Sequence, residues 1–231
     1  MTEKQRTLSV VIPALNESKA IRLVVASVPV RELAGIGYAT QIVVVDNGST
    51  DGTGDLARQA GADVVLEPNR GYGRAYKAGY RRATGDIIVS ADADMTYPLE
   101  TLPELVQMMD RDGLDLLTTN RFGMMDKGAM PLRNKMGNAL LTFLTTLLTG
   151  LRLKDSQSGM WIIRKSLLDR LDLKSNGMPL SQELKIKACR RTRAWREVPI
   201  VYRQRVGEPK LRPWRDGLSN LWHLFRAGWK A

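Results

Sequence analysis

Short apolar runs alternate with longer amphipathic stretches along the first half of the chain. The short runs are rich in β-branched residues and bounded by turn residues, as buried strands are, and they lie at residues 8–13, 41–46, 63–67, 86–90 and 114–119. The longer stretches have helical spacing and lie at residues 18–28, 51–60, 74–83 and 99–112. Asp51 is placed to cap the second of these helices. The alternation predicts an α/β fold with a mainly parallel sheet flanked by helices.

The second half of the chain is less regular. After a loop rich in Gly and Met at residues 123–131, the apolar stretch 133–149 predicts a helix, and residues 160–164 and 196–202 predict strands. At ~100° per residue, six apolar side chains near the C-terminus share one helical stripe: Trp214, Leu218, Leu221, Trp222, Phe225 and Trp229. We therefore expect one domain at residues 1–211 and a basic amphipathic helix at 212–231, which lies either on a membrane surface or on the protein's own core.

The charge and cysteine content narrow the choice of partners and of compartment. Among 231 residues, 35 Lys and Arg against 24 Asp and Glu give a net charge of +11, which favours phosphorylated ligands, anionic lipid headgroups or nucleic acid. Cys189 is the single cysteine, which excludes an internal disulfide and a multi-cysteine zinc site. The N-terminus lacks an apolar leader, and the longest uncharged stretch falls short of the ~20 residues of a spanning helix. We expect a cytoplasmic protein.

Acidic side chains follow three of the predicted strands. The first strand leads into Asn-Glu at residues 16–17, the second ends in Asp46, and the fourth leads into Asp92 and Asp94. Carboxyl ends of parallel strands meet at one edge of a sheet, so these groups are expected to converge. Two carboxylates spaced i and i+2 can turn toward one cation, and oxygen ligands suit Mg²⁺ or Mn²⁺ bridging a diphosphate. Turn formation would explain any one of these motifs, whereas three together favour a diphosphate site.

A glycine-rich segment precedes the third predicted helix. Gly71 and Gly73 do not form a dinucleotide-binding fingerprint, because the third glycine is misplaced and the acidic strand end, Asp46, comes before them. Such a loop can bring backbone close to a ligand, with Arg70 or Arg74 near phosphates, or it can simply open a helix with a solvated basic face. Both interpretations stay open.

Six segments together resemble the family 2 glycosyltransferases with the GT-A fold. In order along residues 8–211 they are VVIPALNE, VVVDNGSTDGT, NRGYGRAYKAGY, SADADMTYP, DSQSG and EVPIVYRQRVGEPKL. Within that family they are most similar to the branch that makes dolichyl- or polyprenyl-phosphate sugars. The resemblance implies inverting, metal-dependent transfer of a hexose from a nucleotide diphosphate-sugar, UDP-glucose or GDP-mannose, to a polyprenyl or dolichyl phosphate.

The resemblance also implies a role for particular residues on the donor side. The positions implied to bind the nucleotide-sugar are Pro13, Leu15, Glu17, Asp46, Asp92, Arg205 and Lys210. Asp92 and Asp94 would hold Mg²⁺ or Mn²⁺, and Asp94 counts among the catalytic residues. Related lipid-phosphate mannosyltransferases often carry a metal-binding Gln where this chain has Thr96, which leaves the metal preference open.

A basic loop near the end of the domain would act as a lid. The resemblance implies that Arg203, Arg205 and Lys210 close over the diphosphate, and Gly207 would permit the movement. On the acceptor side, Arg121 and Arg133 are implied as catalytic residues that clamp a phosphate through charge-assisted hydrogen bonds. Without the resemblance, either arginine would equally be a solvent-facing charge.

The acceptor is the main alternative that the sequence leaves open. A phosphate oxygen can attack without a protein base, whereas a soluble or saccharide hydroxyl acceptor would need one, and Asp155 or Glu183 are the candidates. His223 lies in the basic tail and is not a credible base. Nucleic acid is not an expected partner, because the carboxylate cluster would repel a phosphate backbone. We expect instead a membrane surface or a membrane-protein partner in place of the C-terminal spans of many family members, with the enzyme peripheral on the cytoplasmic face.

Overall fold

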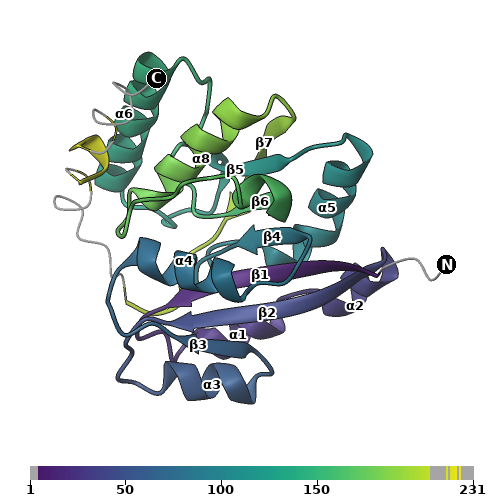
Figure 1. Cartoon of the computed structure of the whole chain (residues 1–231). Coiled ribbons are helices and arrows are strands. Elements are labelled where there is room, and N and C mark those ends of the chain that lie inside the picture. The colour runs from purple at the N-terminus through teal and green to yellow at the C-terminus, as the bar shows by residue number, and fades with distance from the viewer. Residues whose placement is uncertain (1–4, 209–216, 218, 223, 225–231) are drawn as a thin grey trace.

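A computed structural model gives the fold of residues 5–208, 217, 219–222 and 224, which are the residues described below. A sheet of seven strands in the order β3-β2-β1-β4-β6-β5-β7 forms the centre of the molecule (Figure 1). The strands are β1 (Arg6–Ala14), β2 (Tyr38–Asp46), β3 (Asp63–Leu66), β4 (Ile87–Ser90), β5 (Leu116–Met125), β6 (Trp161–Arg164) and β7 (Trp195–Tyr202). Only β6 runs antiparallel to its neighbours, β4 and β5, so the predicted mainly parallel α/β sheet is confirmed.

Helices cover both faces of this sheet. One face packs against α1 (Ile21–Ala26), α2 (Val30–Gly35), α3 (Thr53–Gln59), a 3₁₀ turn η1 (Leu99–Thr101) and α5 (Leu102–Arg111). The other packs against α4 (Tyr72–Arg82), α7 (Lys165–Leu168) and α8 (Leu180–Arg191), while α6 (Leu132–Thr149) stands at the periphery (Figure 1). Side chains alternate between the two cores along β1: Val10 and Ile12 enter the first, and Val11 enters the second.

The structure differs from the predicted elements in a few places. The predicted helix 18–28 is shorter, and α2 follows it after Pro29, which sets the start of the new helix. The N-cap of α3 is Gly52, and Asp51 lies one residue earlier, where its Oδ1 accepts a hydrogen bond from the Thr53 amide at 3.1 Å. The fifth strand runs on to Met125, into the segment predicted as a loop, because it pairs with β7 beyond a bulge.

The predicted C-terminal amphipathic helix falls largely outside the described residues. This includes the boundary at residues 211 and 212 and four members of the predicted stripe: Trp214, Leu218, Phe225 and Trp229. Of the described residues in this segment, Leu224 is fully buried, whereas Trp222 is 61% exposed. Within the described part of the chain, the structure has no helix long and apolar enough to cross a membrane.

Candidate active site

The loops after β1 and β2 are bound to each other at the carboxyl edge of the sheet. The Asn16 amide donates to Ser49 Oγ at 3.0 Å, and Asn16 Oδ1 accepts from the Thr50 amide at 2.8 Å. The Glu17 amide donates to Thr53 Oγ1 at 2.9 Å. Asn16 has a φ of +53°, a left-handed conformation that Asn adopts more readily than most residues. The polar side chains of these two motifs therefore hold the edge in shape.

Two cavities share this edge. The β1 cavity has a volume of about 480 Å³ and is lined by residues that include Pro13, Leu15, Glu17, Asn47 and Gly71. The α6 cavity has a volume of about 530 Å³ and is lined by residues that include Tyr97, Arg121, Arg133, Asn138 and Gln157. Five residues line both cavities: Tyr72, Asp92, Asp94, Met178 and Arg205. The two carboxylates and Arg205 thus lie where the cavities meet.

Asp92, which is half-buried, and Asp94, which is buried, form a pair of carboxylates beyond β4. Burial raises the pKa of Asp92, and the neighbouring charge of Asp94 raises it further, to about 7. Asp92 Oδ1 accepts hydrogen bonds from the hydroxyl groups of Tyr72 and Tyr76 at 3.3 and 3.4 Å. The structure therefore concentrates negative charge at a place where solvent neutralises it poorly, which favours a bound cation.

Asp94 is fixed by its own turn and by the loop after β7. Its Oδ1 accepts hydrogen bonds from the Thr96 hydroxyl at 2.6 Å and from the Thr96 amide at 3.1 Å. Its Oδ2 lies 3.4 Å from Nη1 of Arg205, whose Nη2 donates to Glu17 Oε1 at 2.8 Å. The Val206 amide donates to the Asp94 carbonyl at 2.9 Å. The basic loop therefore lies across the carboxylates, with Arg205 bridging the two cavities.

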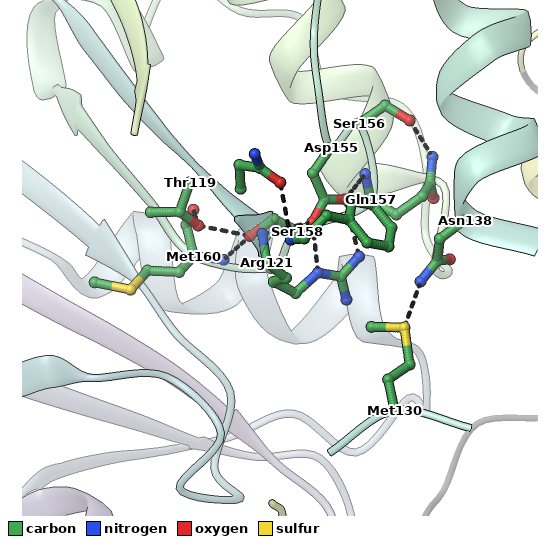
Figure 2. A network of polar contacts seen from close by, with 12 residues as sticks. Thr119, Arg121, Met130, Asn138, Asp155, Ser156, Gln157, Ser158 and Met160 are labelled. Atoms are coloured by element: carbon green, nitrogen blue, oxygen red, sulfur yellow. Dashed lines mark hydrogen bonds and ion pairs between the residues drawn. The ribbon is translucent and has the colours of Figure 1, made fainter. Parts of the chain in front are cut away.

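Arg121 is the buried cation of the α6 cavity. Figure 2 shows its guanidinium facing Asp155, which it binds through Nε to Oδ2 at 2.7 Å and through Nη2 to Oδ1 at 2.9 Å. Burial alone would raise the pKa of Asp155, but the charge and hydrogen bonds of Arg121 outweigh it and hold that pKa below its usual value. Nη1 of Arg121 makes no hydrogen bond to a described residue, so this nitrogen of the guanidinium remains available to a ligand.

The turn at residues 155–159 is anchored from behind. The buried Lys185 ammonium donates to the Asp155 carbonyl at 3.0 Å, and the Glu197 carboxylate accepts from the Asp155 amide at 2.9 Å. The Gly159 amide donates to the Tyr97 hydroxyl at 2.6 Å. Since these bonds fix the backbone on both sides of the Asp155 side chain, the orientation of Arg121 is set by the body of the protein rather than by its own flexible chain.

Comparison with known proteins decides the family. The model of glycosyl transferase family 2 matches residues 9–172. This chain belongs to glycosyl transferase family 2. The dolichyl-phosphate hexose transferase of Haloferax volcanii is 37% identical over 214 residues, covering 92% of this chain and 90% of that protein. The low-salt glycan biosynthesis hexosyltransferase Agl6 of the same organism is 35% identical over 221 residues, covering 93% of this chain; the chain spans 52%, about half, of that relative's length.

Solved structures agree with the family. Glucosyl-3-phosphoglycerate synthase from Mycobacterium tuberculosis, in complex with uridine diphosphate, superposes with a TM-score of 0.77 at 26% identity, covering 96% of this chain and 80% of that one. The same enzyme in complex with Mn²⁺, UDP-glucose and phosphoglyceric acid gives a TM-score of 0.75 at 25% identity, with the same coverage of both chains. The GT-A fold and the glycosyltransferase class, of the hexosyltransferase type, are confirmed.

In this family 2 glycosyltransferase, the structure brings together most of the residues that the sequence singled out. Lining the β1 cavity are Pro13, Leu15, Glu17, Asp92, Asp94 and Arg205. Arg121 and the exposed Arg133, the second residue of α6, line the α6 cavity with Asp94. Asp46 lines neither cavity; its Oδ1 accepts from the Ser49 amide at 2.8 Å. Lys210 lies outside the described residues.

Other candidates have structural roles instead. Asp155 is a poor general base because Arg121 occupies both of its oxygens. Glu183 lines neither cavity and is bound to the amides of Lys174 and Ser175 at 2.9 and 2.7 Å. Arg70 and Arg74 line neither cavity. Arg203 points to Glu100 rather than to the carboxylates.

The glycine-rich loop serves packing. A Cβ atom at Gly71 would lie 2.5 Å from the Asn176 carbonyl oxygen, and one at Gly73 would lie 2.4 Å from that of Ser175. Only glycine permits this approach of two backbones. Gly71 also lines the β1 cavity, so the loop shapes the site through its backbone.

Several lining residues escaped the sequence analysis. Asn47 joins the loop after β2 to the loop after β3, since it donates to the carbonyls of Glu67 and Asn69 at 2.9 Å each and accepts from the Gly71 amide at 2.7 Å. Tyr97 reaches the site from the turn after β4. An Asn following a strand-end Asp is the one available signal for the first, and nothing in the spacing indicates the second.

Proposed function

We propose that this chain transfers a hexose from UDP-glucose or GDP-mannose to the phosphate of a polyprenyl or dolichyl lipid, with inversion at the sugar C1. The observation that carries the proposal is the meeting of two cavities at Asp92 and Asp94, one of them holding Arg121 and Arg133. A donor in the β1 cavity and a phosphate in the α6 cavity would meet at that junction. Similarity to a dolichyl-phosphate hexose transferase supports the lipid acceptor.

A divalent cation, Mg²⁺ or Mn²⁺, fits the carboxylate pair. The raised pKa of Asp92, caused by burial and by Asp94, means that the two charges are held together at a cost that a cation would relieve. No third Asp, Glu, His or Cys joins the pair among the described residues, so diphosphate oxygens and water would complete the oxygen shell. When bound, the cation would neutralise charge on the departing nucleoside diphosphate. The similar enzyme crystallised with Mn²⁺ and UDP-glucose supports this assignment.

The donor-side residues of this chain would orient the nucleotide-sugar. Pro13, Leu15 and Glu17 line the β1 cavity and would enclose the base and ribose. Arg205, which lies between Glu17 and Asp94, would turn toward the diphosphate and place positive charge where negative charge develops.

The acceptor-side residues would hold a phosphate monoester. Its second pKa is about 6, so it is largely a dianion at neutral pH and needs no protein base. Arg121, fixed by Asp155, would offer Nη1, and Arg133 would close the clamp from the rim. A phosphate oxygen then forms the bond to the sugar C1 while the bond from C1 to the diphosphate oxygen breaks. The electron pair leaves with the nucleoside diphosphate. In-line attack of this kind inverts the anomeric centre.

A hydroxyl acceptor is the competing possibility. It is favoured by the similar structure that was crystallised with UDP-glucose and phosphoglyceric acid. It is disfavoured because the two carboxylates that we considered as bases, Asp155 and Glu183, are occupied by Arg121 and by backbone amides. A lipid acceptor would place the enzyme on the cytoplasmic surface of a membrane, alone or with a membrane-protein partner.

The test is transfer of radiolabelled sugar from UDP-glucose and GDP-mannose to polyprenyl phosphate in detergent, with Mg²⁺ or Mn²⁺. We expect labelled lipid from one donor, and we expect chelator or Asp94→Ala to abolish it. Label transferred to phosphoglycerate or to a saccharide, with none in lipid, would overturn the lipid acceptor. Full transfer in the presence of chelator would overturn the metal.

A further inference from the structure

The helix α6 has two unlike faces. Leu141, Thr142 and Thr145 are buried against the protein, and the Thr142 hydroxyl lies 3.1 Å from Ser156 Oγ in the 155–159 turn. Five large apolar side chains are instead between 58% and 72% exposed: Leu132, Met136, Leu140, Phe143 and Leu147. These five are the α6 stripe. They are almost half of the large apolar side chains exposed in the described part of the chain, so the surface is concentrated rather than scattered.

The stripe is narrow and continuous. At ~100° per residue, its five members fall within an arc of about 80°, opposite the three buried residues. From Leu132 to Leu147 the helix rises ~22 Å at ~1.5 Å per residue. The stripe therefore follows almost the whole length of a helix that stands at the edge of the molecule (Figure 1).

Positive charge borders the stripe. On the same helical projection, the exposed Arg133 and Lys135 lie on its two sides, about 20° and about 60° beyond it. From residue 127 to residue 154 the chain has five Lys or Arg and no Asp or Glu. An apolar stripe flanked by basic side chains fits the boundary between acyl chains and anionic headgroups.

The same helix forms a wall of the α6 cavity. Arg133, Asn134, Gly137, Asn138 and Leu141 line that cavity, and none of the five stripe residues does. Stripe and cavity thus share one helix, which would bring the cavity to whatever surface the stripe contacts.

We propose that the outer face of α6 lies in the plane of a bilayer that contains anionic lipids and holds the mouth of the α6 cavity at its surface. The basic border favours this partner over a second copy of the chain, whose net charge of +11 would repel it. The inference rests on the proposed function, which gives the reason for membrane contact: a polyprenyl phosphate would enter the α6 cavity from the membrane. Its measurement needs neither donor nor acceptor.

The test is co-sedimentation of the full chain with phosphatidylcholine vesicles, with and without phosphatidylglycerol. Wild type should bind the anionic vesicles, and Phe143→Ser with Leu147→Ser should lower the partition coefficient by about a hundredfold, roughly tenfold for each side chain withdrawn from acyl contact. Lys135→Gln should lower binding to anionic vesicles about fivefold and leave neutral vesicles unaffected. Leu23→Ser and Leu66→Ser, which change exposed apolar side chains elsewhere, should bind like wild type.

Two results would overturn the inference. One is equal vesicle binding by the Phe143→Ser, Leu147→Ser variant and the Leu66→Ser control. The other is light scattering that shows a dimer for wild type and a monomer for the Phe143→Ser, Leu147→Ser variant, which would make α6 a contact between copies. Sugar transfer separates this from the proposed function. Normal sugar transfer in detergent without vesicle binding would contradict only the proposal that α6 contacts a membrane. Vesicle binding without transfer of sugar to lipid would contradict only the proposal of a lipid acceptor.

Discussion

The β1 cavity and the α6 cavity are built in different ways. The first is formed mainly by loops that follow adjacent parallel strands and bond to each other through short contiguous motifs, such as Asn16 to Thr50. The second gathers β5, α6 and the 155–159 turn, and its buried Arg121 depends on Asp155, which is 34 residues away in the chain.

This difference shows how the two sides can vary independently. A site made mainly by local motifs keeps its shape wherever the sheet edge is kept, since the bonds of Asn16 and Glu17 to the loop after β2 run between neighbouring loops. A site made by distant segments can change its acceptor when one helix or turn changes, while the carboxylates at the junction stay in place. The proposed function assigns the donor to the first side and the acceptor to the second.

The largest effect should come from the residue that both cavities share. Asp94→Asn removes one of two carboxylates that would hold the cation, so kcat for sugar transfer should fall by about a thousandfold or more. Asp169→Asn, which changes an exposed acid in an i,i+4 pair with Lys165, is the matched control and should keep full activity. If Asp94→Asn kept a tenth of wild-type activity, the claim that Asp94 holds the cation where the two cavities meet would be contradicted.

The α6 cavity can be perturbed through Asp155, which binds the buried Arg121. Asp155→Asn leaves the Arg121 charge buried without its partner, and we expect the free energy of unfolding in urea to fall by about 3 kcal/mol. The KM for polyprenyl phosphate should rise, while UDP binding, measured by calorimetry on the folded variant, should stay unchanged. Loss of UDP affinity with unchanged acceptor KM would reverse the assignment of the two cavities.

An acidic residue outside both cavities sharpens the comparison. Burial would raise the pKa of Glu183, but hydrogen bonds from the Lys174 amide, Lys187 and Ser175 outweigh it and lower the pKa from its usual 4.5 to about 2. A carboxylate with a depressed pKa stabilises the fold at pH values above its usual pKa, and this stabilisation is lost as the pH falls toward the depressed pKa. Glu183→Gln should therefore cost about 2 kcal/mol of unfolding free energy at pH 7.

The pH dependence checks that reason. The stability difference between wild type and Glu183→Gln should shrink as the pH falls from about 4.5 to about 2, followed by urea unfolding at each pH. A difference that stays constant over this range would show that the cost comes from packing. Transfer per folded molecule at pH 7 should stay within about twofold of wild type, since the hydrogen bonds of Glu183 support a loop and not a ligand.

The smallest effect should come from Thr96. Thr96→Val removes the hydroxyl bond to Asp94 Oδ1, and loss of such a supporting bond costs about tenfold in metal affinity. The affinity for Mn²⁺ in the presence of UDP, measured by electron paramagnetic resonance, should fall by that factor. Thr101→Val, which removes a hydroxyl bond to the Pro98 carbonyl, should leave it unchanged. Equal Mn²⁺ affinity in both variants would show that Thr96 does not orient Asp94.

The sequence predicted the gathering of carboxylates at the sheet edge better than it predicted the surroundings of Arg121, for a physical reason. Strands bounded by Asn, Asp and Gly are local signals, and parallel strands place their ends together, so the convergence of Glu17, Asp92 and Asp94 followed from periodicity and topology. The role of Asp155 could not be predicted in this way, because the local sequence around a carboxylate in a turn is the same whether it serves as a base or as the partner of a buried arginine.

Helix α8 was not predicted at all, and its burial explains why. Polar members such as Gln182, Glu183 and Lys185 are buried beside Leu184 and Ile186, so the apolar periodicity that marks a surface helix is missing. Asp46 shows the opposite case, since its motif indicated a ligand and its side chain binds its own turn. Local pattern thus identifies which residues gather at the edge, while tertiary contacts decide which of them face the cavity.

The most direct test of the two-cavity account is Arg133→Gln, measured for acceptor KM and for UDP affinity side by side. Arg133 is exposed, so the fold should tolerate the change, and Arg152→Gln, an exposed arginine lining neither cavity, is the control. In detergent, the account predicts that the KM for polyprenyl phosphate rises about tenfold through loss of a charge-assisted bond, with unchanged Kd for UDP. An unchanged acceptor KM, or a weakened affinity for UDP, would contradict it.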